Sequence, residues 1–582
     1  MSTSPLENEK PIETLFHADV GASSAKSSAI TASGTNNSKH PVHLKTFLAI
    51  ASIGLIYFAQ LITLVGAGAQ GHTIAAHFND TTNIIWLTAP IGTLTVVLGP
   101  IVSQAADYWG RKWFLVVCTM FGAVGSTVIA RATSMSMLIA GFTISGVAFG
   151  AQPLLHTVTS EILPRRWRGW GQAVDSISNS LGAIFGLLFG GALNRSGDPA
   201  SNGFRSYFLV NMAWYVAAAV LCLLVYNPPP REKQRQFTTK EKLAKLDWIG
   251  YFFLTTGLVL FSVGLSYSKN PYEWTDPRVS ATFAVGLGLF LCLTTYEILF
   301  KKDGMFHHGL FTGNRNFTIS LIAVACDGIA FFAANTYFAF QVSLFYEKDA
   351  LLVGVRYSIV LIASCVGAFV TGWYCAAARR IRWVTVAAFV VFLIFFICMA
   401  TSSASSGKAV WFFPVLMGTA LGMTLTSLIT AAQLSTPPEL IAVASGLIIS
   451  VRSLGGTVAL AIFNALFLDE TSHLGENIAA AAVSAGLPPE DAGQLVTALT
   501  MQNETALASM PGATPEIIST GADALFATYL TAFRHVWIAA ACFVAVAAVV
   551  ATFLFDPKQE FNMRIDAPIE KQAPDNLVEG GI

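Results

Sequence analysis

Long apolar runs alternate with short polar connections along most of this chain. A helix needs about 20 apolar residues to cross a bilayer, and fourteen runs reach that length. They lie at residues 46–69, 84–104, 113–132, 136–158, 170–193, 207–226, 248–267, 279–299, 317–340, 352–376, 383–401, 409–432, 441–467 and 532–555. The pattern predicts an all-α membrane protein with fourteen spanning helices and both termini on the same side.

Composition supports this class and excludes others. Of the 582 residues, 54% are hydrophobic and 12% are charged, whereas a soluble domain has about 25% charged residues. The formal net charge of zero gives no general attraction to nucleic acid. The sequence has no Walker loop, HExxH or GxSxG motif, and its eight cysteines show no metal-ligand spacing. We expect neither an enzyme nor a bound cofactor or metal, so any pumping must be driven by a gradient.

Lysine and arginine orient the spans. Connections after even-numbered spans hold about 17 of these residues, and connections after odd-numbered spans hold about 7. Because cytosolic loops are enriched in Lys and Arg, both termini should be cytosolic. Three N-x-[ST] sequons, at Asn79, Asn194 and Asn503, then fall outside, where glycosylation could occur. The polar segment 1–45 lacks an apolar core, which indicates a disordered tail rather than a signal peptide.

A short polar loop between the second and third runs carries the most specific motif. It reads SQAADYWGRK, from Ser103 to Lys112. It resembles the signature loop of the major facilitator superfamily, G-x-x-x-D-[RK]-x-G-[RK]-[RK]. The matching positions are Asp107, Gly110, Arg111 and Lys112, while Ser103 replaces a glycine and Tyr108 replaces a cation. The resemblance implies a carrier that alternates its access between the two sides of the membrane.

A helix-start signal elsewhere in the chain offers this loop a partner. Thr436 and Glu439 flank two prolines just before the thirteenth run, which is the spacing of a capping box. A helix N-terminus carries partial positive charge, so we expect Asp107 to dock on it and close the cytosolic gate, as in the transporters that the loop resembles. The alternative is that Asp107 only caps its loop and that Arg111 and Lys112 only set topology.

Glycine recurs every four residues in the fifth run, at Gly182, Gly186 and Gly190, and Gly191 follows. Such a stripe lets another helix approach closely. It resembles the antiporter motif of drug:proton carriers, G-x-x-x-G-P-x-x-G-G, with Leu187 in place of the proline. The arginine that relatives carry in span four is also absent, because Phe142 stands there. Packing alone remains the alternative reading of the stripe.

Ionisable residues inside spans point to function because burying them in a bilayer is costly. Asp327 and Arg452 each lie roughly 16 Å from the cytosolic end of their helices, which predicts an ion pair near the midplane. His156 and Asp175 lie at one level on either side of a short turn, which suggests a proton relay, and Glu161 could join it. Each pair could instead only fix helix register.

Aromatic and polar residues in two runs are candidates for a central cavity. In the resembled fold, the helix equivalent to the ninth run lines such a cavity, and an aromatic wall suits large lipophilic molecules. Lipid-facing aromatics are the alternative. The candidates are Phe331, Phe332, Tyr337 and Gln341 in the ninth run, Thr426, Thr430 and Gln433 in the twelfth, and Gln152 in the fourth.

Four longer strings, at 102–114, 146–155, 160–169 and 246–253, resemble the fungal trichothecene efflux pump-like family, a fourteen-span branch of drug:proton antiporters. Siderophore-iron transporters are close relatives of that family. The resemblance implies the major facilitator fold, with two six-helix bundles and two extra central helices. The expected parts are a cytosolic tail (1–45), a first bundle (46–227), a linker (228–247), two extra helices (248–300), a second linker (301–316), a second bundle (317–555) with an outer insert (469–530), and a cytosolic tail (556–582).

The resemblance also implies a function. We expect a monomeric carrier in the plasma membrane, or the vacuolar membrane, that exports a lipophilic organic compound such as a fungal secondary metabolite or mycotoxin in exchange for protons. Two alternatives stay open. The chain could take up a ferric siderophore, or it could be a transport-dead nutrient receptor with the insert as its sensor.

Overall fold

The structure is a computed structural model. It describes residues 44–569 apart from 79, 81, 82, 194–202, 268–271, 302, 348, 349, 501–506, 508, 509, 511 and 513. The predicted glycosylation sites Asn79, Asn194 and Asn503, and the predicted tail before residue 44, lie outside the described residues.

The first half of the chain forms helices over its apolar runs. The predicted fourth span is two helices rather than one, because the helix is interrupted at Gly150 and Ala151. The elements are α2 (Leu44–Ala69), α3 (Gly71–His77), η1 (Ile84–Leu87), α4 (Ala89–Trp109), α5 (Arg111–Ala130), α6 (Met135–Phe149), α7 (Gln152–Ile162), η2 (Arg165–Trp167), α8 (Arg168–Leu193) and α9 (Gly203–Val225).

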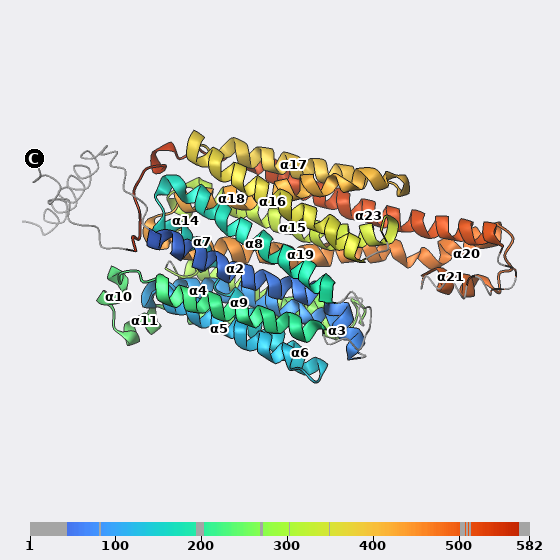
Figure 1. The fold of residues 1–582 in the computed structure, drawn as a ribbon, viewed down its shortest axis with the longest axis horizontal. Coiled ribbons are helices and arrows are strands. Elements are labelled where there is room, and N and C mark those ends of the chain that lie inside the picture. The colour runs from blue at the N-terminus through green and yellow to red at the C-terminus, as the bar shows by residue number, and fades with distance from the viewer. Residues whose placement is uncertain are drawn as a thin grey trace, which may run out of the picture. The chain divides into compact units, whose positions relative to one another are not determined.

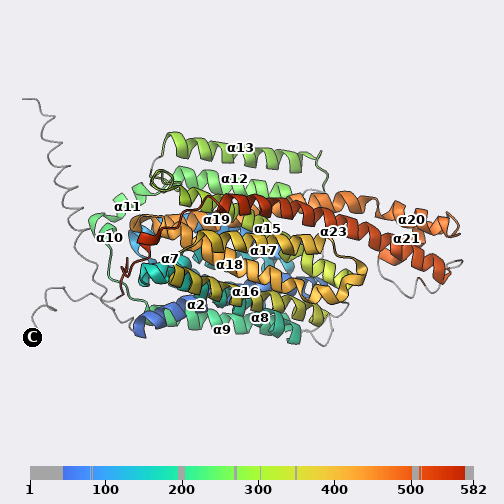
Figure 2. The same ribbon diagram turned by 90° about the horizontal axis from the view of Figure 1, so that it is seen from above.

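Between the halves lie a linker and the two extra helices. Thr238 and Glu241 form a capping box at the N-terminus of the second linker helix. The backbone N–H of Thr238 donates to the Glu241 carboxylate and lowers its pKa. Figure 2 shows α13 lying outside α12, which faces the other helices. The elements are α10 (Glu232–Gln236), α11 (Thr239–Lys245), α12 (Trp248–Tyr267), α13 (Pro277–Leu299) and α14 (Gly309–Thr312).

The second half contains the longest helices. The elements are α15 (Arg315–Phe345), α16 (Ala350–Ala378), α17 (Arg382–Ala400), η3 (Ala404–Trp411), α18 (Phe413–Leu434), η4 (Pro438–Leu440), α19 (Ile441–Ser472), α20 (Leu474–Ser484), α21 (Ala492–Thr500), α23 (Pro515–Ala551) and η5 (Lys558–Glu560). The predicted all-α membrane fold is confirmed. Within the described residues, fourteen helices are long and apolar enough to cross a membrane.

Helices run through both ends of the predicted outer insert. Helix α19 continues to Ser472 and α23 begins at Pro515, so long helices occupy both ends of the segment 469–530. Alanine-rich sequence favours helix, and these helices bury a small apolar cluster of their own that includes Ile478, Leu495 and Ile517. In Figure 1, α20 and α21 lie at one end of the helices and α10 and α11 at the other. We call these the insert end and the linker end.

The two halves meet along two pairs of helices, α4 with α19 and α8 with α16. Small residues allow the close approach. A Cβ atom on Gly446 would lie 2.7 Å from the Ser103 Oγ, and a Cβ atom on Gly372 would lie 3.0 Å from the Gly169 carbonyl oxygen. The signature loop therefore sits at the linker end of a tightly packed seam between the halves.

Candidate functional site

An ion pair joins two helices inside the second half. The Arg452 Nε donates to the Asp327 Oδ2 at 2.8 Å, linking α19 to α15. Asp327 is fully buried, whereas the Arg452 side chain is 18% exposed and its guanidinium lies 4.6 Å from the centre of the Phe331 ring. The second oxygen of Asp327, Oδ1, is buried without a hydrogen-bond partner among the described residues. The pair is therefore fixed on one side and incompletely satisfied on the other.

A second buried acid–base pair lies inside the first half. The His156 Nδ1 on α7 is 3.4 Å from the Asp175 Oδ2 on α8, and both side chains are fully buried. The same nitrogen is 2.7 Å from the Gln172 Oε1, and the Thr159 hydroxyl donates to the Asp175 Oδ1 at 3.0 Å. The Tyr57 hydroxyl lies 3.4 Å from the His156 Nε2. Polar side chains therefore surround both ring nitrogens.

The contacts of Gln172 assign the hydrogen on this histidine. The Gln172 amide nitrogen donates to the Ser160 Oγ at 2.7 Å and to the His156 carbonyl oxygen at 3.0 Å. The Gln172 Oε1 is therefore the acceptor toward the imidazole, and His156 carries a hydrogen on Nδ1. The Nε2 atom is then the acceptor toward the Tyr57 hydroxyl, 3.4 Å away.

Glu161 does not join this pair, which corrects the predicted relay. Its carboxylate forms ion pairs with Arg111 and Arg231. Arg111 also donates to the Asp107 Oδ1 at 3.1 Å, so the signature loop, α7 and the linker form one charge cluster. Tyr226 lies beside Arg111 in this cluster, and burial raises the pKa of its hydroxyl above the usual value. Arginine ties Glu161 to the signature loop more strongly than a neutral histidine could.

The other motif residues complete this corner. Lys112 donates to the Asn227 Oδ1 at 2.9 Å. Gly110 has a φ of +94°, in the region that favours glycine, and a side chain there would overlap Gln234. The glycine in the motif is therefore required by both the backbone conformation and the space available.

The predicted capping box before the thirteenth span is absent. The Thr436 hydroxyl donates back to the Ala432 carbonyl oxygen at 2.7 Å, so it satisfies the end of α18 rather than the start of α19. Helix α19 begins after the short η4 turn, has Leu440 as its N-cap and makes no side-chain cap hydrogen bond. Glu439 is exposed within that turn. Asp107 pairs with Arg111 in this structure, and docking of Asp107 on this helix start stays a prediction.

Gln433 connects the halves at the linker end, although the sequence placed it in a cavity. Its Oε1 accepts from the Ser160 hydroxyl and, at 3.3 Å, from Gln172. Its amide nitrogen donates to the Ser445 Oγ at 2.9 Å, and its carbonyl oxygen accepts from Arg168 at 2.8 Å. Through Gln172, this connection reaches His156.

Residues 555–569, which we call the C-terminal strap, cross between the halves at the same end. Asp566 pairs with Arg165 and with the buried Arg168 of the first half. Phe561 is buried against the second half, in a cluster with Cys375 and Leu434. Part of the segment predicted as a tail, 556–582, is therefore packed structure, and residues 570–582 lie outside the described residues.

The glycine stripe serves packing within the first half. A side chain at Gly182 would overlap the Phe58 backbone of α2. Gly186 faces the Tyr207 hydroxyl, where a Cβ atom would lie 2.8 Å away, and Gly190 faces Gln70. Gly191 follows on the same helix, half-buried. The stripe seats α8 against its neighbours, and its predicted relation to antiport stays a prediction.

Tyr337 and Gln341, which the sequence placed in the wall of a central cavity, lie instead in the core of the second half. Tyr337 is buried with its ring 5.6 Å from the Phe467 ring, between α15 and α19. Gln341 accepts from the Trp537 Nε1 at 2.7 Å and donates to Ser402 at 3.0 Å. Because both polar ends of the Gln341 side chain have hydrogen-bond partners, the side chain can stay buried in the core.

The remaining cavity candidates lie in different surroundings. The Thr426 hydroxyl is 3.3 Å from the Ser176 hydroxyl across the halves. The Thr430 hydroxyl donates to its own helix, at the Thr426 carbonyl oxygen. Phe332 is half-buried and packs edge-on against Phe331, and Gln152 is half-buried at the first residue of α7.

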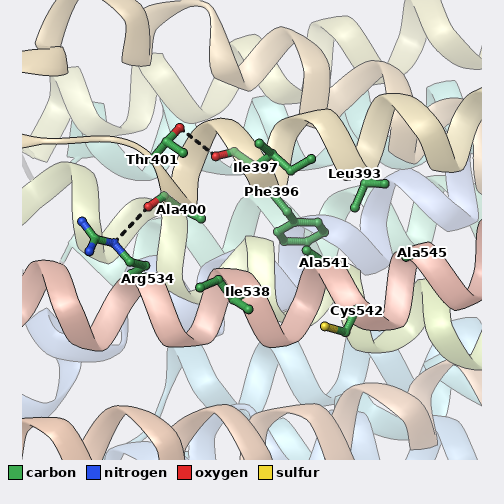
Figure 3. A pocket seen from close by; sticks show the side chains of 10 residues that line it. All are labelled: Leu393, Phe396, Ile397, Ala400, Thr401, Arg534, Ile538, Ala541, Cys542 and Ala545. Carbon is green, nitrogen blue, oxygen red and sulfur yellow. Dashed lines mark hydrogen bonds between the residues drawn. The ribbon is translucent and has the colours of Figure 1, made fainter.

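A groove of about 720 Å³ runs between α17 and α23 (Figure 3). Its lining is apolar apart from Arg534, which donates to the Ala400 carbonyl oxygen, and Thr401 at the same end. Ile397 and Ile538 on its rim are exposed on the outside of the second half. The groove therefore lies away from the seam and from both acid–base pairs.

Several residues of the site carry little signal in the sequence. Gln172 lies one turn before Asp175 on α8, so helical spacing could have grouped them. Tyr57 and Asp566 approach His156 and Arg168 from remote parts of the chain, and no local pattern marks them.

Comparisons with known proteins agree with this architecture. Residues 46–460 match the family model described as Major Facilitator Superfamily. The chain is 24% identical over 490 residues to the MFS-type efflux transporter ffsH of Aspergillus flavipes, across 83% of this chain and 82% of the relative. It is 22% identical to the trichothecene efflux pump TRI12 of Fusarium sporotrichioides, across 75% and 73% of the two chains. The solved structure of a bacterial homologue of the human drug peptide transporters PepT1 and PepT2 superposes with a TM-score of 0.52 and 13% identity, across 87% of this chain and 98% of that one.

Proposed function

The chain belongs to the Major Facilitator Superfamily and is a multi-pass secondary transporter, and we propose that it exports a lipophilic organic compound from a fungal cell in exchange for protons. Two fungal relatives that align over most of their length are named as an efflux transporter and a trichothecene efflux pump. The low identity supports the class of cargo, a lipophilic secondary metabolite or toxin, and not one compound.

The linker end is the cytosolic end in this proposal. The connections there hold the arginines of the signature loop, η2 and the linker, and lysine and arginine are enriched in cytosolic loops. The plasma membrane is the expected location, because export from the cell requires it. Both termini then face the cytosol.

Export requires the linker end to open, because the cargo is loaded from the cytosol. In this structure that end is held closed by Gln433, which bonds to Ser160 and Gln172, and by the strap, where Asp566 pairs with Arg168. Opening must break these contacts between the halves. The strap therefore acts as a latch on the inner gate, together with the packing of α4 on α19.

The ion pair between Asp327 and Arg452 carries the proposal of proton coupling. Arginine stays protonated under physiological conditions, so a proton taken up by the pair must bind Asp327. Protonation would remove the carboxylate charge and free the Arg452 guanidinium, which already lies over the ring of Phe331 and is partly exposed. Binding of a proton and binding of an aromatic or lipophilic cargo beside Phe331 could thus oppose each other through Arg452.

Inside-out plasma-membrane vesicles from cells that express the protein test the proposal. We expect a labelled trichothecene, used as the first probe of a panel of lipophilic compounds, to enter vesicles energised by a proton gradient and to stop when a protonophore is added. Asp327→Asn should lower the rate at least tenfold, since it breaks a buried pair. Asp303→Asn is the matched control, because that side chain is 87% exposed. Accumulation of a labelled ferric siderophore in intact cells, without export of any probe, would contradict the proposal and favour uptake.

A further inference from the structure

Two buried carboxyl groups lie in the extra helices, outside both acid–base pairs described above. Asp247 directly precedes α12 and Glu297 lies near the end of α13, and each residue is 1% exposed. The Asp247 Oδ1 accepts from the Gly250 N–H at 3.1 Å. The Glu297 oxygens accept from the Met305 and Phe306 N–H groups at 3.3 Å each. Each carboxyl thus has backbone donors on one side.

The two carboxyl groups also lie beside each other. A side chain at Gly250 would overlap the Asp247 Oδ2, and its Cβ atom would lie 3.0 Å from the Glu297 Oε1, so both oxygens border the same point. The Asp247 and Glu297 carboxyl groups are therefore neighbours in a buried place. Ionised carboxylates only accept hydrogen bonds, so a bond between them requires one proton.

No neighbouring cation among the described residues neutralises the two carboxyl groups in place of a proton. Among the described residues, no lysine, arginine or histidine side chain forms an ion pair with either acid, and the Asp247 Oδ2 is buried without a hydrogen-bond partner. The titratable groups beside the acids are Tyr251 and Tyr296 on the two helices and His308, whose Nε2 is 3.1 Å from the Glu297 backbone oxygen. Tyr108 on α4 lies near Tyr251 and Asp303. Without the proton, two anions would adjoin in a buried place, which is costly.

We propose that Asp247 and Glu297 bind one proton between them, and that this proton fastens the hairpin of α12 and α13 to both halves of the transporter. The hairpin reaches the first half through Tyr251, whose hydroxyl donates to Gln104 on α4. It reaches the second half through the N–H groups of Met305 and Phe306, which lead into α14 and α15. The site is independent of which compound is carried.

A proton fits this site better than a metal ion. The site offers two carboxyl groups, and the described residues contain no group of three or more His, Cys, Asp or Glu side chains placed to hold a metal. A Cβ atom on Gly250 would already meet both carboxyl groups, which leaves little room beside them. A divalent cation bound by proteins usually takes six or more oxygen ligands.

Infrared difference spectroscopy between neutral and alkaline pH on the purified full-length protein tests the proposal. We expect the carbonyl band of one protonated carboxyl at neutral pH, lost when the pH is raised. Asp247→Asn and Glu297→Gln should each abolish this band, because an amide N–H then bridges the pair and the remaining acid ionises. Asp303→Asn, which removes a neighbouring exposed acid, should keep the band. Two variants are used so that one remains informative if the other fails to fold.

Thermal unfolding against pH gives the second readout. The folded wild type holds a proton that the unfolded chain has released at neutral pH, so its unfolding temperature should fall as the pH rises, until the pair ionises. Asp247→Asn should lose most of this fall and Asp303→Asn should keep it. The proposal is overturned if no protonated carboxyl is seen, if the band survives in Asp247→Asn, or if added Mg²⁺ or Ca²⁺ stabilises the wild type in place of the proton.

Discussion

The two buried acid–base pairs differ in what surrounds them. His156 and Asp175 lie in the first half, and Gln172 links them to Gln433 and so to the contact between the halves. Asp327 and Arg452 lie in the second half, where the partly exposed Arg452 contacts Phe331. The first pair is hydrogen-bonded to the contact between the halves, whereas the hydrogen bond of the second pair lies within the second half.

This difference separates two tasks that the sequence alone could not distinguish. A pair linked to the gate can convert a change in charge into a change in the contacts between the halves. A pair with a permanent cation on one side can exchange its proton only at the carboxylate. We therefore propose that His156 belongs to the inner gate and that Asp327 exchanges the proton.

The largest expected effect comes from removing the ion pair between the strap and the first half. Asp566→Ala leaves the buried Arg168 without its carboxylate partner, which costs about 3 kcal/mol in the closed state. That energy corresponds to a rise of about 100-fold in the open population. The measurement is the maleimide labelling rate of Cys375, which is buried between Gly169 and Phe561, in a variant that keeps this cysteine alone.

Cys326 provides the control for that measurement, in a second variant that keeps Cys326 as its only cysteine. It neighbours Asp327 and is 8% exposed. Its labelling should change little in Asp566→Ala if the second pair is separate from the gate. Equal increases at Cys375 and Cys326 would show that the two regions move together and would remove the distinction between the pairs.

A smaller effect is expected from Gln433. Replacing Gln433 with alanine removes its side-chain hydrogen bonds to Ser160, Gln172 and Ser445. Lost hydrogen bonds of this kind cost about 1.5 kcal/mol together, so Cys375 labelling should rise roughly tenfold. Gln341→Ala is the matched control, since it removes a buried glutamine inside the second half. A larger gate effect from Gln341→Ala than from Gln433→Ala would contradict the assignment.

The next prediction concerns His156. Its ring contacts Gln172, which bonds to Gln433, so His156→Leu should raise Cys375 labelling a few-fold. Asp327→Asn should leave this labelling unchanged. The reverse pattern would exchange the roles of the two pairs.

The smallest effect is expected at the helix start that the sequence marked as a capping box. Because the Thr436 hydroxyl bonds to α18, Thr436→Ala should change Cys375 labelling by less than about twofold. A true N-cap would cost about 1 kcal/mol when lost. An effect as large as that of Gln433→Ala would mean that Thr436 stabilises the gate after all.

Much of the fold could be predicted, because hydrophobic length alone marks a spanning helix. The approach of Asp327 to Arg452 could also be anticipated, since isolated charges in apolar helices need partners. The contacts of Glu161, Gln433 and the strap could not. They join side chains that are far apart in the sequence, and the sequence offers several possible partners for each of them. The capping pattern failed because a hydroxyl can bond backward to the preceding helix as well as forward.

The central claim, that a proton bound at Asp327 is exchanged for cargo, is tested most directly in proteoliposomes that hold the purified protein and a pH-sensitive dye. Addition of a transported compound should drive a proton flux in the opposite direction in the wild type. Asp327→Asn should abolish that flux while the compound still binds, and His156→Leu should retain it. An unchanged ratio of protons to compound in Asp327→Asn would contradict the account.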